Sequence, residues 1–157
     1  MKKIITSILL ASILAFFLFI YTSQPLKIEG HSTFDDGHTQ VVVYELHNDG
    51  FTKVHIKDVA VNGRSDSDIV QLGVSYDTSQ FVQFLSDNPN IMFMEFDQEP
   101  IFPKVSPKDI KAIIEKNEMT PIHYGIKVEQ PEHLIESLTI QYRYFGFPVT
   151  KTYKVRD

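Results

Sequence analysis

The side chains best suited to chemistry in this 157-residue chain are six histidines and a few closely spaced carboxylates. His47 and His55 flank the turn sequence 48–50, so they would approach each other if the segments on either side paired as strands. The histidines lack the H-x-H or H-x-x-x-H spacing that places two imidazoles on one metal ion. Val54 and Ile56 are expected to point inward, so His55 should point to solvent. We interpret the histidines as solvated side chains and expect no metal site.

Two acidic segments are candidates for cation binding or catalysis. Segment 62–68, Asn-Gly-Arg-Ser-Asp-Ser-Asp, is rich in oxygen ligands but lacks the residue order and closing glutamate of a calcium loop, so a polar hairpin connection explains it better. Glu95, Asp97 and Glu99 recur at every second position, and three like charges on one strand face indicate a solvated face. The sequence has no nucleophile elbow, P-loop, dinucleotide motif or zinc-protease motif. We therefore expect no catalytic residue, no cofactor and no enzyme activity.

Aromatic side chains are the remaining candidates. Phe145 and Phe147 flank Gly146 at the tip of a predicted hairpin, where burial is difficult. An exposed aromatic tip would contact a partner or a membrane, although packing into the core or against other parts of the chain is the favoured interpretation of these rings. Phe145 and Phe147 are thus the candidate partner-contact residues.

Composition excludes several classes of function. The chain contains no cysteine, so it has no disulfide, no thiolate nucleophile and no acylated lipoprotein cysteine. Its net charge is −5, and the part that follows Lys3 carries 13 basic and 20 acidic residues, a net charge of −7. An acidic domain without a basic cluster repels phosphate backbones, so no nucleic-acid partner is expected.

The N-terminal segment has the features of a membrane anchor. Residues 4–26 carry no charge, and 4–21 would form a helix of about 27 Å, close to the thickness of a bilayer's hydrocarbon core. Lys2 and Lys3 form a positive flank that would stay in the cytoplasm and place the rest of the chain outside, with Tyr21 as an interfacial anchor. A cleaved signal peptide is the competing interpretation, although no A-x-A-like site follows the apolar run.

These observations divide the chain into four parts. Residues 1–3 are a cytoplasmic n-region, 4–21 a transmembrane anchor or signal peptide, 22–27 a tether containing Pro25, and 28–157 an extracytoplasmic β-sandwich domain. The size of the last part suits one hydrophobic core.

Alternating apolar residues predict a mainly β domain. A change of phase at Lys57–Asp58 indicates a bulge, and Asn62–Gly63 and Phe145–Gly146 are predicted turns. Ser106 and Pro107 should begin one short helix, with Ile110, Ile113 and Ile114 on its apolar side and Asn117 at its end. The predicted strands are 39–47, 51–61, 70–76, 81–85, 91–96, 122–128, 138–144 and 149–155. Short strands at these intervals favour two packed antiparallel sheets.

Three features together resemble a known kind of protein: the Met1–Lys3 start with its apolar segment, the segment 45–63 (ELHNDGFTKVHIKDVAVNG) and the strand 138–146 (LTIQYRYFG). The chain resembles small, uncharacterised membrane-anchored proteins of Gram-positive bacteria with an immunoglobulin-like β-sandwich domain. The resemblance implies that fold and a location at the cell membrane, and it assigns no functional residue.

The sequence therefore predicts a membrane-tethered, non-catalytic binding or accessory module whose partners are the membrane and another envelope protein. The alternative is an envelope enzyme or small-ligand binder whose site is assembled from distant residues and is not visible in the sequence. A pocket of roughly several hundred Å³ lined by convergent histidine and carboxylate groups would favour that alternative, and a filled interior with scattered charges would count against it.

Overall fold

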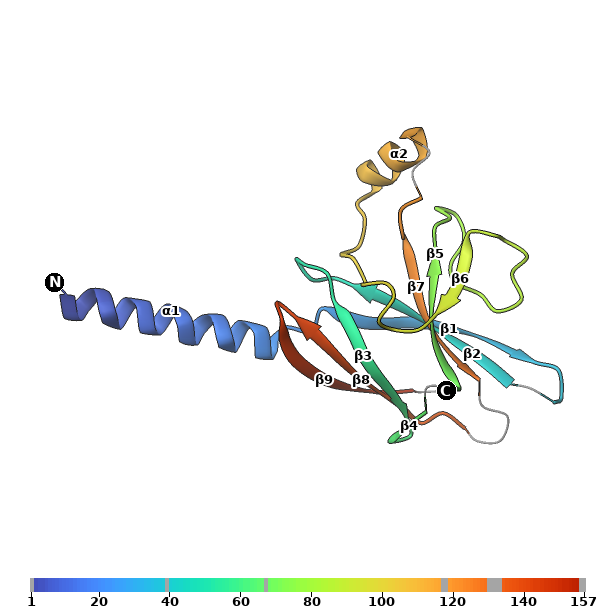
Figure 1. Ribbon diagram of the computed structural model, residues 1–157, viewed down its shortest axis with the longest axis horizontal. Helices are drawn as coiled ribbons and strands as arrows, with labels where there is room; N and C mark the ends of the chain where they lie inside the picture. Colours follow the sequence, from blue (N-terminus) through green and yellow to red (C-terminus); the bar gives the residue numbers. More distant parts are fainter. Residues whose placement is uncertain (1, 39, 67, 117–118, 130–133, 156–157) are drawn as a thin grey trace.

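A long apolar helix projects from one end of a β-rich domain in the computed structural model (Figure 1). The structure describes residues 2–38, 40–66, 68–116, 119–129 and 134–155. Helix α1 spans Lys2–Thr22, and strand β1 begins at Leu26, so residues 23–25 connect the two. Leu26 and Lys27, which the sequence placed in the tether, belong to the first strand. The side chain of Tyr21, the predicted interfacial anchor, lies outside the described part.

Within the described residues, nine strands form two antiparallel sheets. The five-stranded sheet has the order β1-β2-β7-β5-β6, and the four-stranded sheet has the order β4-β3-β8-β9. The strands of the first sheet are β1 (Leu26–Asp35), β2 (Gln40–Asn48), β7 (His123–Glu129), β5 (Val70–Ser75) and β6 (Ile91–Met94). Those of the second are β4 (Arg64–Ser65), β3 (His55–Val61), β8 (Ser137–Tyr144) and β9 (Phe147–Lys154). The mainly β prediction and the two antiparallel sheets are confirmed.

One hydrophobic core lies between the sheets. Tyr44 and Leu46 of β2 face it from the five-stranded sheet, and Tyr142 and Tyr144 of β8 face it from the other. Alternation with period two explains why the residues between them point away from this core. A backbone bridge between Val54 and Ile101 links the segment before β3 to the loop after β6.

The predicted turns and the bulge are present. The β3–β8 register shifts between Ile56 and Asp58, at the predicted bulge. Asn62 and Gly63 have φ values of 50° and 79° and connect β3 to β4, as expected of a two-residue hairpin turn. Helix α2 (Pro107–Lys116) begins where the sequence placed its start, with Ser106 Oγ accepting from the backbone N–H of Asp109. The predicted end at Asn117 lies outside the described residues.

Two predictions about the elements are wrong. Residues 81–85 form no strand; Val82 and Phe84 instead pack on the outer face of the five-stranded sheet, where Val82 joins Val41 and Val43 in a second, smaller cluster. In α2, Ile114 of the predicted apolar side is largely exposed, so this helix does not cover a sheet with its whole stripe.

Candidate functional site

A small pocket that contains several charged and imidazole side chains lies on the outer face of the five-stranded sheet. Glu45 and His47 of β2 point to this face because Tyr44 and Leu46, their neighbours in the strand, point into the core. The pocket has a volume of about 200 Å³. We call it the histidine pocket, and its lining residues are Glu29, Glu45, His47, Phe81, Lys104, Val105, Ile110, Ile122 and His123.

His47 is held between two carboxylates in this pocket. Its Nε2 lies 2.8 Å from Glu45 Oε1 and 3.5 Å from Glu29 Oε2, and the side chain is only 12% exposed. Glu29 reaches this position because the β1–β2 register shifts between Ile28 and Gly30. Since a carboxylate accepts hydrogen bonds, His47 Nε2 donates to Glu45. The prediction that His47 is a solvated side chain is therefore wrong.

His123 of β7 brings the second imidazole of the histidine pocket. Its Nε2 is buried and has no hydrogen-bond partner among the described residues. The Phe81 ring packs against it, with 4.3 Å between the ring centroids. Burial lowers the pKa of His123, and a hydrogen bond to the Thr78 backbone opposes that effect. The imidazole is therefore neutral at neutral pH, and its Nε2 is a buried polar atom without a hydrogen-bond partner among the described residues.

The pocket's side chains are suited to hydrogen bonding and proton transfer. A histidine between carboxylates can relay a proton, but the lining residues include no hydroxyl or thiol that such a base would activate. Within the described parts of the chain, no group of three or more histidine, aspartate or glutamate side chains is arranged to hold a metal ion. Glu29 and Lys104 line the pocket and could hydrogen bond to a small polar group there.

The contact residues predicted from the sequence lie outside the histidine pocket, on an apolar surface. Phe145 and Phe147 flank the β8–β9 turn at the end of the domain from which α1 projects, and they are 42% and 37% exposed (Figure 1). Phe145 contacts Phe16 and Phe147 contacts Phe17, with ring centroids 6.0 Å and 5.3 Å apart. The two residues thus lie against the chain's own N-terminal helix.

Two other groupings of candidate residues do not form. His47 and His55 do not approach each other through strand pairing, because β2 and β3 belong to different sheets. Glu95, Asp97 and Glu99 do not share a strand face, because β6 ends at Met94 and the backbone turns immediately afterwards.

The histidine pocket was missed by sequence reasoning. Glu45 and His47 stand two positions apart in a predicted strand, and this spacing alone would have placed them on one face. His123 lies in a strand that is distant in the sequence, and only the pairing of β2 with β7 brings it near. Comparison with known proteins gives no guide to the pocket: no family model, no curated protein and no solved structure matches the chain.

Proposed function

We propose that this chain is a single-pass membrane protein whose immunoglobulin-like β-sandwich domain lies outside the cell and acts as a non-catalytic binding module for another envelope protein. Two antiparallel sheets that share one core support the sandwich part of the proposal. Kinship with membrane-anchored proteins of Gram-positive bacteria belongs to the same proposal and rests on the sequence features given above.

The observation that carries the proposal is the surface of α1. Residues Lys3–Ile20 form a helix that is long and apolar enough to cross a membrane. Of its described side chains, Ile20 alone is buried, so aliphatic and aromatic groups face outward all around the helix. An apolar surface of this size is unstable in water but suits a hydrocarbon environment, where the helix also satisfies its own backbone hydrogen bonds.

The charge distribution supports the orientation. Lys2 and Lys3 precede the apolar segment, and positive flanks remain on the cytoplasmic side. The domain that follows is acidic, which also argues against a nucleic-acid partner. Cleavage of the segment would instead release a soluble domain, and the mass of the mature chain distinguishes the two outcomes.

Crosslinking in the native membrane, followed by mass spectrometry, tests the binding role. We expect one envelope protein to be captured by the full chain and by a control chain in which an unrelated membrane span replaces residues 4–21. Capture by the full chain alone would assign binding to the helix. Absence of any specific capture would contradict the binding role.

The histidine pocket favours a second candidate function, the binding of a small polar ligand. Two imidazoles and two carboxylates converge there, and the His123 Nε2 has no partner among the described residues. Native mass spectrometry of the protein purified from its own membrane tests this candidate. A small molecule that stays bound to the wild type and is lost in His123→Phe would support it, and a wild-type mass without any adduct would count against it.

A further inference from the structure

Six phenylalanines gather where α1 meets the domain. We call them the aromatic collar: Phe16, Phe17 and Phe19 of α1, Phe51 of the β2–β3 connection, and Phe145 and Phe147 of the β8–β9 turn. Phe51 contacts Phe19 with 6.4 Å between ring centroids, and it is 82% exposed. Three separate rings of the domain therefore lie against the last turns of a membrane-spanning segment and still present apolar surface outward.

The position of these rings along α1 sets their depth. The segment Lys3–Ile20 is about 27 Å long at 1.5 Å per residue, so Ile20 lies near the boundary of a hydrocarbon core about 30 Å thick. Phe17 precedes Ile20 by three residues, which places it about 4.5 Å inside that boundary. Because Phe147 contacts Phe17 directly, the hairpin tip reaches the same level. Interfacial side chains commonly lie at such depths.

The backbone of the hairpin tip points to the same role for its side chains. Phe145 has φ of 50° and Gly146 has φ of 82°, the conformation of a tight hairpin turn in which asparagine, aspartate or glycine is favoured at both positions. A phenylalanine at positive φ makes this turn less stable, by about 1 kcal/mol. The ring is thus present despite the local backbone preference, so it is not explained by turn formation.

A hydrogen bond links the β2–β3 connection, which carries Phe51, to the end of β8 next to the hairpin turn. Tyr144 Oη accepts from the backbone N–H of Phe51 at 3.1 Å, and the Tyr144 ring packs on Phe145 with 4.7 Å between centroids. Since Tyr144 is fully buried, Phe51 and the hairpin tip are fixed to the core and to each other. They would enter a bilayer surface as one rigid unit.

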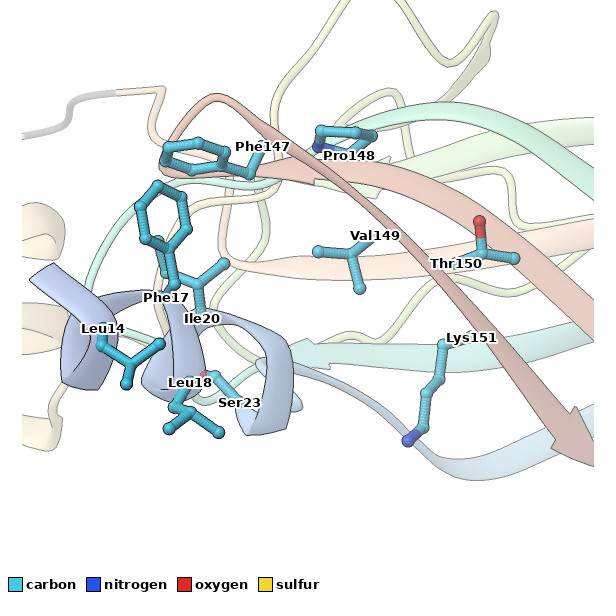
Figure 2. A pocket seen from close by; sticks show the side chains of 10 residues that line it. All are labelled: Leu14, Phe17, Leu18, Ile20, Ser23, Phe147, Pro148, Val149, Thr150 and Lys151. Carbon is cyan, nitrogen blue, oxygen red and sulfur yellow. The ribbon is translucent and has the colours of Figure 1, made fainter.

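An apolar groove beside the collar is open to the same environment. It lies between α1 and β9 and has a volume of about 610 Å³, with Phe17 and Phe147 facing each other at one end (Figure 2). Leu14 and Leu18 of the membrane-spanning segment form its helical wall, so lipid chains are its natural occupant. Lys151 lies four residues along β9 from Phe147, about 13 Å away, where its amine would meet the headgroups.

We propose that Phe51, Phe145 and Phe147 insert into the leaflet on the domain's side of the membrane, beside α1, so that the domain rests on the bilayer in a fixed orientation. The inference rests on the proposed anchoring by α1. Its occupant is lipid: the three rings continue the apolar surface of the span itself, and the connection of residues 23–25 is too short to hold the domain far from the membrane.

Single tryptophans test the insertion, because the chain contains none. The full-length variants Phe147→Trp, Phe17→Trp and Phe81→Trp are reconstituted in phosphatidylcholine–phosphatidylglycerol vesicles, with and without lipids brominated near the headgroup end of the acyl chains. Phe81 is a matched control, since it is 46% exposed but lies in the histidine pocket. We expect bromine to quench Phe147→Trp and Phe17→Trp several-fold more than Phe81→Trp.

The three probes separate the possible failures. Quenching of Phe17→Trp without extra quenching of Phe147→Trp would overturn the insertion while leaving the anchor intact, and would mean that the collar packs on α1 or on a protein partner only. Absence of quenching at Phe17→Trp would overturn the anchoring and the insertion together. The double replacement Phe145→Ser with Phe147→Ser should also reduce quenching of a tryptophan at position 51, and unchanged quenching there would overturn the proposal. Circular dichroism verifies that each variant retains its sheets.

Discussion

Two tyrosines of the same strand should respond in opposite directions to the same substitution. Tyr142 and Tyr144 both belong to β8, both point into the core, and both are almost completely buried. Tyr144 Oη accepts a hydrogen bond from the Phe51 N–H, whereas Tyr142 Oη has no partner among the described residues. Burial also raises the pKa of Tyr142 to about 12. Replacing either tyrosine with phenylalanine removes one hydroxyl and leaves the packing of the ring.

The expected magnitudes follow from the hydrogen-bond inventory. Tyr144→Phe loses one neutral hydrogen bond and should lower the free energy of unfolding by about 1 kcal/mol. Tyr142→Phe removes a buried hydroxyl that is desolvated without compensation, and should raise the free energy of unfolding by about 1 kcal/mol. The two variants should therefore differ by about 2 kcal/mol.

Urea titration of the full chain in detergent micelles, followed by the far-ultraviolet circular dichroism of the sheets, measures both effects. The slope of the free energy against urea should stay unchanged, because neither substitution alters the surface exposed on unfolding. A Tyr142→Phe variant that is less stable than the wild type by as much as Tyr144→Phe would refute the reasoning, since Tyr142 would then make a hydrogen bond of its own.

Three further predictions use the same titration. Asn48→Ala should lower the free energy of unfolding by about 3 kcal/mol, because the buried Asn48 side chain donates to two backbone carbonyls and accepts from one backbone N–H. The control Asn62→Gly removes three hydrogen bonds from an exposed site and should lower it by about 1 kcal/mol or less. Equal losses of stability in the two variants would contradict the role of burial. Gly73→Ala should cost about 1–3 kcal/mol, since a Cβ there would lie 2.3 Å from a valine methyl group, whereas the strand control Gly30→Ala meets its nearest atom at 3.6 Å and should be close to neutral. Burial lowers the pKa of His123 in the folded state below its ordinary 6.5, so its contribution to stability is present above pH 6.5 and is lost as the pH falls through the lowered value. In His123→Phe, the free energy of unfolding should therefore fall less as the pH is lowered. An unchanged pH dependence of the free energy of unfolding would contradict this prediction.

The sequence was sufficient for elements whose pattern is local. Segments 70–76 and 138–144 alternate cleanly and form β5 and β8. The turn at Asn62–Gly63 follows from both of its residue types, and the turn at Phe145–Gly146 follows from its glycine. The helix start at Ser106 and Pro107 was equally readable, because capping depends on adjacent residues alone.

Elements that depend on distant contacts could not be predicted. Strand β1 was not predicted because its register shifts between Ile28 and Gly30, and the bulge disrupts the alternation that marks a strand. Segment 81–85 is apolar like a strand, but it buries Val82 against the sheet without joining it. The same limit applies to the histidine pocket, since the His123 contribution depends on a non-local strand pairing.

For the candidate contact residues, the sequence predicted the local turn but not the distant contacts. The turn at Gly146 marked Phe145 and Phe147 as difficult to bury, and both rings are partly exposed. Their contacts with Phe16 and Phe17 could not be predicted, because nothing in the sequence indicates that the hairpin tip lies beside α1.

The most direct test of the account is the accessibility of one introduced thiol in intact cells. The chain contains no cysteine, and Lys108 is exposed on α2, so Lys108→Cys provides a single reactive site in the domain. A membrane-impermeant maleimide should label the full-length chain in unbroken cells, and the labelled chain should remain in the membrane pellet after alkaline extraction. Labelling only after lysis would contradict a domain outside the cell, and recovery of the labelled full-length chain in the soluble fraction would contradict its anchoring in the membrane.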